Sequence, residues 1–278
     1  MTRSDPIHVP LEGPLTETRF VERPNRFLLR CELPRGATRG PQGGGVVEVH
    51  LADPGRLEEL LIPGRRVWIR WAASPTRKTD WSAVLVETPD GQGLVSVDTT
   101  MPNKLIHRAL AEDALKEFDG WSLDRAEFPL GASRIDFLLT GGDAPGSAGG
   151  TTDGSDRVAE RAEGYGPQRK LALEVKSVTL VEDEVALFPD AVTARGARHV
   201  RELAEVAGRI DDDGAAWSAA ILFVLQRDDA HRIEAARSID PDFADALAEA
   251  KAAGVRILGR RCRVTKDRLE LGDPVPAT

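Results

Sequence analysis

Three charged residues lie inside apolar segments, where a charge is costly. Glu174 and Lys176 interrupt residues 171–180, a run that otherwise predicts a buried strand. Because side chains alternate between the two faces of a strand, these two charges share one face. The opposite face is apolar and formed by Leu171, Leu173 and Val175. Burying such a pair costs free energy unless each charge has a partner, so the pattern favours a functional role.

A second apolar strand, residues 133–139, carries one acidic side chain, Asp136. Asp136 beside Glu174 would place two carboxylates together, and these repel unless a cation or a proton separates them. A hard divalent ion bound by two carboxylates, water and a substrate phosphate resolves that repulsion, and Mg²⁺ or Mn²⁺ suits these ligands. Lys176 would then orient water or stabilise charge on the phosphate.

An Asp followed by Glu-x-Lys on the next strand is the pattern of metal-dependent nucleases of the PD-(D/E)XK type. The pattern alone has low specificity. Glu249 and Lys251 repeat it inside an Ala-rich helical run, where positions i and i+2 do not face each other. A structural ion network near the end of a sheet is the alternative explanation for Asp136, Glu174 and Lys176.

The length and composition predict two globular domains. The chain has 278 residues, is 41% hydrophobic and 29% charged, and carries a net charge of −8. Residues 1–98 hold 13 basic and 13 acidic side chains, so the remainder carries the whole negative charge. Twelve of those 13 basic residues are Arg, the better residue for phosphate contacts and base stacking, although genome composition also raises Arg usage.

No apolar run approaches the length of a membrane span, and the N-terminus has no signal-peptide core. Cys31 and Cys262 fit no metal-binding spacing, and we expect reduced thiols in a cytoplasmic protein, a single bridge being the alternative. No membrane partner is expected. The oligomeric state is left open, a homodimer included.

Residues 1–98 predict a small β-barrel or sandwich, and a barrel of about five strands would suit single-stranded nucleic acid. The expected strands are 18–21, 26–32, 45–51, 65–72, 81–87 and 93–97, with a Gly-rich hairpin loop at 35–45. Trp68, Trp71 and Trp81 are candidates for base stacking, although at least two are expected to pack in the core. Asp53-Pro54-Gly55 predicts a tight turn before Arg56, a candidate phosphate contact.

Residues 99–278 predict a mixed central sheet flanked by helices, an α/β domain in a chain that is α+β overall. Asn103 is expected to cap a helix over 104–118. The further strands are expected at 121–128, 133–140, 171–180, 216–226, 255–258 and 263–271, with helices from 199 to 208 and over 241–253. Residues 141–169 contain eight Gly and predict a flexible surface insertion. Arg195, His199 and Glu202 share one helical face, which by itself indicates a solvated face.

Several separate stretches together resemble the SfsA family (sugar fermentation stimulation protein A). They occur in the family's order and span residues 15 to 275: 54–64, 102–105, 133–137, 174–180, 188–199 and Pro241 within 239–243. The sequence departs from the pattern in two places. The insertion at 141–169 is longer than expected, and no acidic residue of 104–118 replaces the helical Glu of many such nucleases, since Glu112 is out of register.

The resemblance implies an OB-fold-like barrel followed by a PD-(D/E)XK restriction-endonuclease-like domain. It implies DNA binding, DNA or RNA nuclease activity with Mg²⁺ or Mn²⁺, and a regulatory effect on sugar (maltose) use. It assigns catalysis to Asp136, Glu174 and Lys176, with the first two as metal ligands. It also implies nucleic-acid-binding or supporting roles for Arg56, Asn103, Arg134, Ser177, Asp190, Arg195 and His199.

Two hypotheses follow. The first is a metal-dependent phosphodiesterase in which Lys176 positions the attacking water. The second is a DNA-binding regulator of sugar-metabolism genes with little turnover. The acidic second domain argues slightly against this hypothesis, because tight binding of a duplex depends on Lys and Arg contacts to phosphates. Retention of Asp136 and Glu174 favours the enzyme, because a pure binder would gain from losing carboxylates that repel phosphate.

Overall fold

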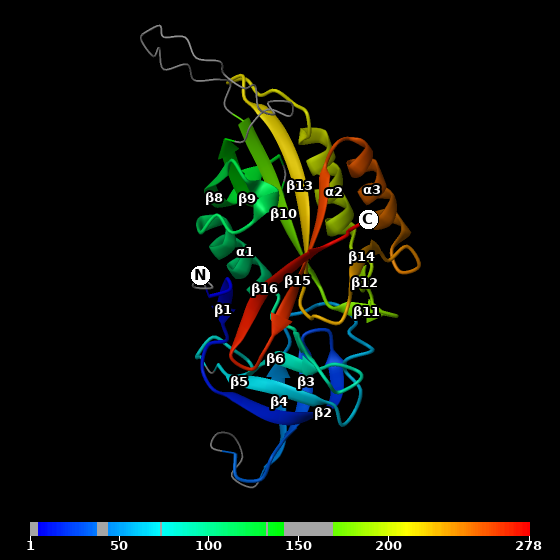
Figure 1. Cartoon of the computed structure of the whole chain (residues 1–278). Coiled ribbons are helices and arrows are strands. Elements are labelled where there is room, and N and C mark those ends of the chain that lie inside the picture. The colour runs from blue at the N-terminus through cyan, green and yellow to red at the C-terminus, as the bar shows by residue number, and fades with distance from the viewer. Residues whose placement is uncertain (1–4, 38–43, 73, 132, 142–168) are drawn as a thin grey trace, which may run out of the picture.

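The computed structural model describes residues 5–37, 44–72, 74–131, 133–141 and 169–278, which form a barrel joined to a larger α/β domain (Figure 1). The predicted flexible insertion falls almost wholly outside these residues. In the described part of the chain, no helix has the length and apolar character needed to cross a bilayer.

The N-terminal domain is a closed five-stranded barrel, as predicted. Its strands follow the order β4-β3-β2-β5-β6, and parallel pairing of β4 with β6 closes the cylinder. A short β7 extends the sheet beside β6. The bounds are β2 (Leu15–Asn25), β3 (Leu28–Leu33), β4 (Gly45–His50), β5 (Arg66–Trp71), β6 (Trp81–Glu87) and β7 (Leu94–Ser96). Antiparallel pairing of β3 with β4 confirms the predicted hairpin.

Two of the three tryptophans that were candidates for stacking on bases are buried, Trp81 in the barrel core and Trp68 in the cluster that the barrel shares with α1. Trp68 and Trp81 are each 3% exposed, so both are core residues, as the packing alternative predicted. Trp71 is half-buried, and its ring packs edge-on against Trp81 at a centroid distance of 5.0 Å. Base stacking by Trp68 or Trp81 is therefore excluded, because neither ring is accessible.

The second domain is built on a seven-stranded mixed sheet in the order β1-β16-β15-β13-β10-β9-β8. β10 pairs parallel with β13 and antiparallel with β9, which makes it a central strand. The strands are β1 (His8–Pro10), β8 (Trp121–Leu130), β9 (Ser133–Gly141), β10 (Arg169–Val178), β13 (Ala216–Leu225), β15 (Arg256–Val264) and β16 (Arg268–Val275). A small second sheet joins β11 (Leu180–Glu182), β12 (Val185–Phe188) and β14 (Arg232–Ala235).

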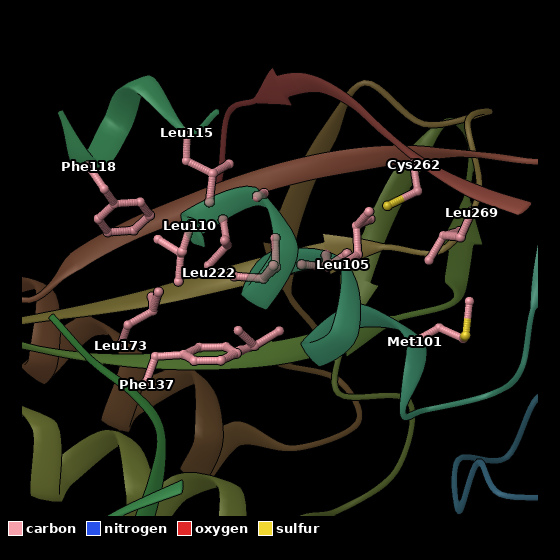
Figure 2. Packing of buried hydrophobic residues seen from close by; sticks show 14 of the residues in the cluster. Met101, Leu105, Leu110, Leu115, Phe118, Phe137, Leu173, Leu222, Cys262 and Leu269 are labelled. Atoms are coloured by element: carbon pink, nitrogen blue, oxygen red, sulfur yellow. The ribbon is translucent and has the colours of Figure 1, made fainter. Parts of the chain in front are cut away.

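Helices cover both faces of the large sheet, which explains why its central strands are apolar on both sides. α1 (Met101–Ala111) packs on one face, where Leu105 and Leu110 meet Leu173 and Leu222 (Figure 2). The helices α2 (Ala194–Val206) and α3 (Pro241–Ala252) lie side by side against the opposite face (Figure 1). The predicted α/β architecture is thus confirmed.

Several boundaries differ from the prediction. α1 starts after Thr100 and ends at Ala111, because Asp113 takes a left-handed backbone (φ 48°) and only a short 3₁₀ turn, η1 (Lys116–Phe118), follows. Asn103 therefore lies in the first turn of α1 and is not its cap. β15 continues to Val264, beyond the predicted end at 258, and β16 begins only at Arg268, after a turn over 265–267.

The first residues of the chain also differ from the prediction, which placed all of residues 1–98 in the barrel domain. β1 pairs antiparallel with β16, so this segment belongs to the large sheet rather than to the barrel. The backbone N–H of Leu11 donates to the carbonyl of Asp267 at 2.7 Å, which continues the pairing toward β2. The N-terminal segment therefore crosses from the sheet to the barrel.

Candidate functional site

The catalytic candidates meet where β9 and β10 part. The antiparallel register between these strands ends at Phe137 paired with Leu173. One residue further along, the carboxylate Oδ2 of Asp136 accepts the backbone N–H of Val175 at 2.7 Å. The carboxylate of Asp136 thus accepts a backbone N–H of β10. This hydrogen bond fixes the carboxylate beside β10 and next to Glu174.

Glu174 is buried and held by two side chains on one of its oxygens. Its Oε1 accepts from Lys176 Nζ at 2.7 Å and lies 3.0 Å from His199 Nδ1. The contact with Lys176 confirms that the two charges of β10 share one face. The second oxygen, Oε2, is buried and has no hydrogen-bond partner among the described residues.

The tautomer of His199 follows from its other neighbour. Arg195 Nε lies 3.4 Å from His199 Nε2, and a guanidinium only donates. His199 Nε2 is therefore the acceptor, and its Nδ1 carries the hydrogen that is donated to Glu174. His199 is buried, so this face of α2 is part of the site and not the solvated face that helical spacing alone indicated.

Asp136 is oriented by α1. Asn103 Nδ2 donates to Asp136 Oδ1 at 2.6 Å. Burial and, after it, the neighbouring charge of Glu174 together raise the pKa of Asp136 to about 6, against the hydrogen bonds from Val175 and Asn103 and the charge of Lys176. The two carboxylates are thus close enough to repel each other.

These features fit a hard divalent cation. The unpartnered Oε2 of Glu174 and the raised pKa of Asp136 mark a place where positive charge would stabilise both carboxylates. Asp136 and Glu174 are the residues that would hold such an ion. Among the described residues, no group of three His, Cys, Asp or Glu side chains is arranged as ligands for one metal, so water and substrate would have to complete its coordination.

A cleft of about 600 Å³ opens beside these residues, between the barrel and the α/β domain. Lys176, Ser177 and Asn103 line it from the α/β domain, as do Asp190 and Arg195. The barrel contributes Arg26 and the turn at 52–55. A substrate in the cleft would therefore touch both domains.

Asp190 forms a clasp between the two domains. Its Oδ2 accepts the backbone N–H of Leu57 at 2.9 Å, its Oδ1 accepts the N–H of Arg56, and its carbonyl accepts from Arg56 Nε at 2.8 Å. The predicted phosphate contacts of Arg56 and Asp190 stay predictions. In this structure both residues bind each other.

The Asp53-Pro54-Gly55 turn is the barrel side of this clasp. A Cβ added at Gly55 would lie 2.8 Å from both carboxylate oxygens of Asp190, so only Gly allows this approach. Asp53 Oδ1 accepts the Gly55 N–H at 2.8 Å, which closes the turn. Arg23 donates to the carbonyls of Arg26 and Gly55, both at 2.7 Å, and so ties this turn to the β2–β3 turn.

Ser177 and Arg134, both predicted to bind nucleic acid or to support the site, lie in different places. Ser177 Oγ accepts from Gln226 Nε2 at 2.7 Å, on the cleft wall. Arg134 is exposed and lies 3.8 Å from Glu127, and it does not line the cleft. The structure therefore gathers Asp136, Glu174, Lys176, Asn103 and His199, whereas Arg134 is held apart from them.

Arg26, Asp53 and Gln226 line or support the cleft, and the sequence reasoning did not assign them a site role. Burial, with a smaller contribution from the charge of Asp190, raises the pKa of Asp53 to about 6. In the sequence, only the turn-forming residues at 24–27 and 53–55 could have drawn attention to this region. The residues reach the site because the barrel packs against the sheet, and no local pattern predicts that packing.

The fold and site define a two-domain protein in which an OB-type barrel and a restriction-endonuclease-type domain share one cleft. Residues 21–97 match the family described as SfsA N-terminal OB domain, and residues 100–268 match the sugar fermentation stimulation protein RE domain. The chain belongs to the SfsA family.

Relatives agree over nearly the whole chain. The sugar fermentation stimulation protein homolog of Shouchella clausii is 42% identical over 263 residues, covering 95% of this chain and 97% of its own length. The homolog of Chloroflexus aurantiacus is 36% identical, covering 98% of this chain and 89% of its own. The structure of Pyrococcus furiosus SfsA in complex with Ca²⁺ matches with a TM-score of 0.73 at 24% identity, covering 99% of this chain and 100% of that one, which shows the same fold.

Proposed function

We propose that this protein is a divalent-metal-dependent nuclease that hydrolyses phosphodiester bonds in DNA or RNA. The observation that carries the proposal is the pair Asp136 and Glu174, with the buried, unpartnered Oε2 of Glu174. Val175 and Lys176, which follow Glu174 on β10, line the cleft. Two carboxylates repel the phosphates of a nucleic acid. Their presence in a nucleic-acid-binding site is therefore expected only if a cation binds between them and the phosphate. Pyrococcus furiosus SfsA was solved with Ca²⁺, a cation that takes the same oxygen ligands.

Each residue then has a chemical role. A bound Mg²⁺ or Mn²⁺ supplies Lewis-acid stabilisation of charge on the phosphate and acidifies water. Lys176 Nζ, held by Glu174, is placed to orient the attacking water or to donate toward a phosphate oxygen. The water's oxygen forms the new P–O bond, one bond to a nucleoside oxygen breaks, and that oxygen receives a proton.

His199 and Asn103 act as positioning residues. His199 holds Glu174 Oε1, which leaves Oε2 free, and Asn103 holds Asp136 Oδ1. Such supporting hydrogen bonds fix the direction of metal-binding oxygens. Arg195 on the cleft wall supplies positive charge for a phosphate.

A second candidate, a DNA-binding regulator with little turnover, is favoured by one observation. Within the described residues, the two carboxylates have no third acidic ligand, and Lys176 and His199 already satisfy Glu174 Oε1. Such a site holds a cation weakly without substrate. A role in sugar use would then follow from DNA binding alone.

Cleavage assays separate the two candidates. Labelled single- and double-stranded DNA and RNA are incubated with Mg²⁺, Mn²⁺ or EDTA, using wild type, Glu174→Gln and Asp136→Asn. Glu205→Gln, at an exposed position of α2, serves as the control. We expect metal-dependent cutting that both site variants lose by at least about a hundredfold and the control retains. Binding by all proteins without cutting under any metal would overturn the enzyme and support the regulator.

A further inference from the structure

The barrel carries a second hollow, of about 660 Å³, beyond the cleft. It is bounded by the β2–β3 turn, by β4 and by the connection between β5 and β6. Its lining residues include Phe27, His50, Arg77 and Lys78. In barrels of this type, the face of the second and third strands and the adjoining loops bind oligonucleotides. We call this surface the barrel hollow.

The side chains of the barrel hollow suit a single nucleic-acid strand. Phe27 is 50% exposed, which is unusual for an aromatic ring and leaves its face available to a base. Lys78 is exposed and has no hydrogen-bond or ion-pair partner among the described residues. Arg77, by contrast, donates to Ser82 Oγ at 2.7 Å. An exposed ring beside a free cation is the pattern by which barrels bind single strands through stacking and phosphate contacts.

The barrel hollow adjoins the cleft, because neighbouring residues line the two spaces. Phe27 lines the hollow, and its neighbour Arg26 lines the cleft. In the same way His50 lines the hollow, and Ala52, two residues further on, lines the cleft. Arg26 is exposed, and its guanidinium has no partner among the described residues. The β2–β3 turn therefore presents a ring to one side and a guanidinium to the other.

A third hollow, of about 420 Å³, continues past the catalytic residues. Asn103 lines both this hollow and the cleft, and Asp136, Lys104 and His107 line its walls. Lys104 is exposed on α1 and has no ion-pair partner in the described chain. Exposed cations thus line both spaces, Arg26 the cleft and Lys104 the third hollow, and Asn103 lies between the two spaces.

The clasp limits what can enter. Gly55 and Asp190 line the cleft and touch so closely that no Cβ fits between them. A space of about 600 Å³ is the size of a small-molecule site and accommodates a short piece of one strand, whereas a duplex would have to separate the domains.

We propose that the substrate is single-stranded nucleic acid that runs from the barrel hollow through the cleft. A base stacks on Phe27, and phosphates contact Arg26 and Lys104 on either side of the bond facing Asp136 and Glu174. This proposal depends on the proposed nuclease function only where it states which bond of the strand is cut. Binding of the strand does not require turnover.

The test measures binding in EDTA, where cleavage cannot occur. Fluorescently labelled ten-nucleotide single strands and duplexes of the same sequence are titrated with wild type, Phe27→Ala, Phe27→Trp, Arg26→Ala and Lys104→Ala. Val46→Ala, which alters an exposed apolar residue of β4 outside the hollow, is the control. Circular dichroism confirms that each variant is folded.

We expect the single strand to bind at least tenfold tighter than the duplex. Phe27→Ala should weaken single-strand binding by roughly 5- to 100-fold, while Phe27→Trp restores it and its fluorescence is quenched by the strand. Arg26→Ala and Lys104→Ala should each reduce the slope of log affinity against log salt by about 0.7. Val46→Ala should bind like wild type.

Equal affinity for duplex and single strand, or unchanged binding by Phe27→Ala and Arg26→Ala, would overturn the proposed path even if the protein cleaves nucleic acid. A dimer in sedimentation that Phe27→Ala converts to monomer, with unchanged strand binding, would assign the hollow to a second copy of the chain and also overturn the proposal. Strand binding as expected without cleavage would instead reject the nuclease alone.

Discussion

At the scale of single residues, the site is a balance of charges around Asp136 and Glu174. Lys176 and His199 stabilise one oxygen of Glu174, while its other oxygen is left unpaired. Asp136 has hydrogen bonds to both oxygens, yet its pKa is raised because burial and the charge of Glu174 outweigh them. Added positive charge would stabilise both carboxylates, and this is the basis of the proposed cation.

Asn103→Ala tests the orientation of Asp136. Loss of the hydrogen bond to Oδ1 should lower metal-dependent cleavage by about ten- to a hundredfold, because supporting hydrogen bonds fix metal-binding oxygens. The free energy of unfolding should fall by only about 1 kcal/mol. Initial rates and urea unfolding measure the two effects, with Glu112→Gln at the other end of α1 as the control. An unchanged cleavage rate would exclude a positioning role for Asn103.

At the scale of elements, Asp240 fixes the start of α2, the helix that carries Arg195 and His199, and the start of α3 beside it. Asp240 is buried, and its Oδ1 caps α3 by accepting the N–H of Phe243 at 3.0 Å. Its Oδ2 accepts the N–H of Thr193 at 2.7 Å, immediately before α2. Thr193 in turn caps α2, since its Oγ1 accepts the N–H of Gly196 at 3.0 Å. One carboxylate therefore sets the start of both helices.

Asp240→Ala should be more destabilising than Thr193→Ala. The first change removes a cap and leaves two buried N–H groups unpaired, which costs about 3 kcal/mol. The second removes one cap and costs about 1 kcal/mol. Urea unfolding followed by circular dichroism gives both values, and Asp240→Asn, which keeps an acceptor oxygen, should fall between them. Equal midpoints for Asp240→Ala and Thr193→Ala would contradict the shared-cap explanation.

At the scale of the whole molecule, the two domains share a hydrophobic core. Trp68 and Leu85 of the barrel belong to the same buried cluster as Leu105 of α1 and Leu269 of β16. Polar contacts add to this, since Ser96 N–H donates to the Gln226 carbonyl at 3.1 Å. The domains are therefore expected to unfold together, and the cleft between them is a fixed feature of the fold.

Glu59 makes this interface sensitive to pH. Burial raises the pKa of Glu59 to about 7 from an ordinary 4.5, although Arg227 lies 3.9 Å away and opposes the shift. Between pH 4.5 and 7 the folded protein thus keeps a proton that the unfolded chain has released, so stability falls as pH rises through this window.

Glu59→Gln should flatten the pH dependence of stability between pH 4.5 and 7 and raise the free energy of unfolding at pH 8 by about 1 to 3 kcal/mol. Denaturant unfolding at several pH values measures both. The adjacent Glu58→Gln, at an exposed position, should follow wild type. A Glu59→Gln curve parallel to that of wild type would show that Glu59 is ionised in the folded state throughout this range.

The sequence by itself determined the barrel, the central strand and the three charges on β9 and β10. These depend on local rules: a period of two residues places Glu174 and Lys176 on one face, and Gly, Pro and Asp mark the turns between barrel strands. The end of α1 was harder to predict, because the left-handed backbone at Asp113 interrupts a sequence whose apolar spacing continues to Phe118.

Only the tertiary structure decided how the site is completed. Asn103 was predicted as a helix cap, yet packing of α1 on the sheet directs its amide to Asp136. His199 could be placed against Glu174 only once α2 lay on the same face as that side chain. The clasp joins Asp190 to Arg56 across 134 residues, and Arg26 reaches the cleft through the same packing of barrel against sheet. Such contacts follow from the packing of whole domains, which no local period in the sequence encodes.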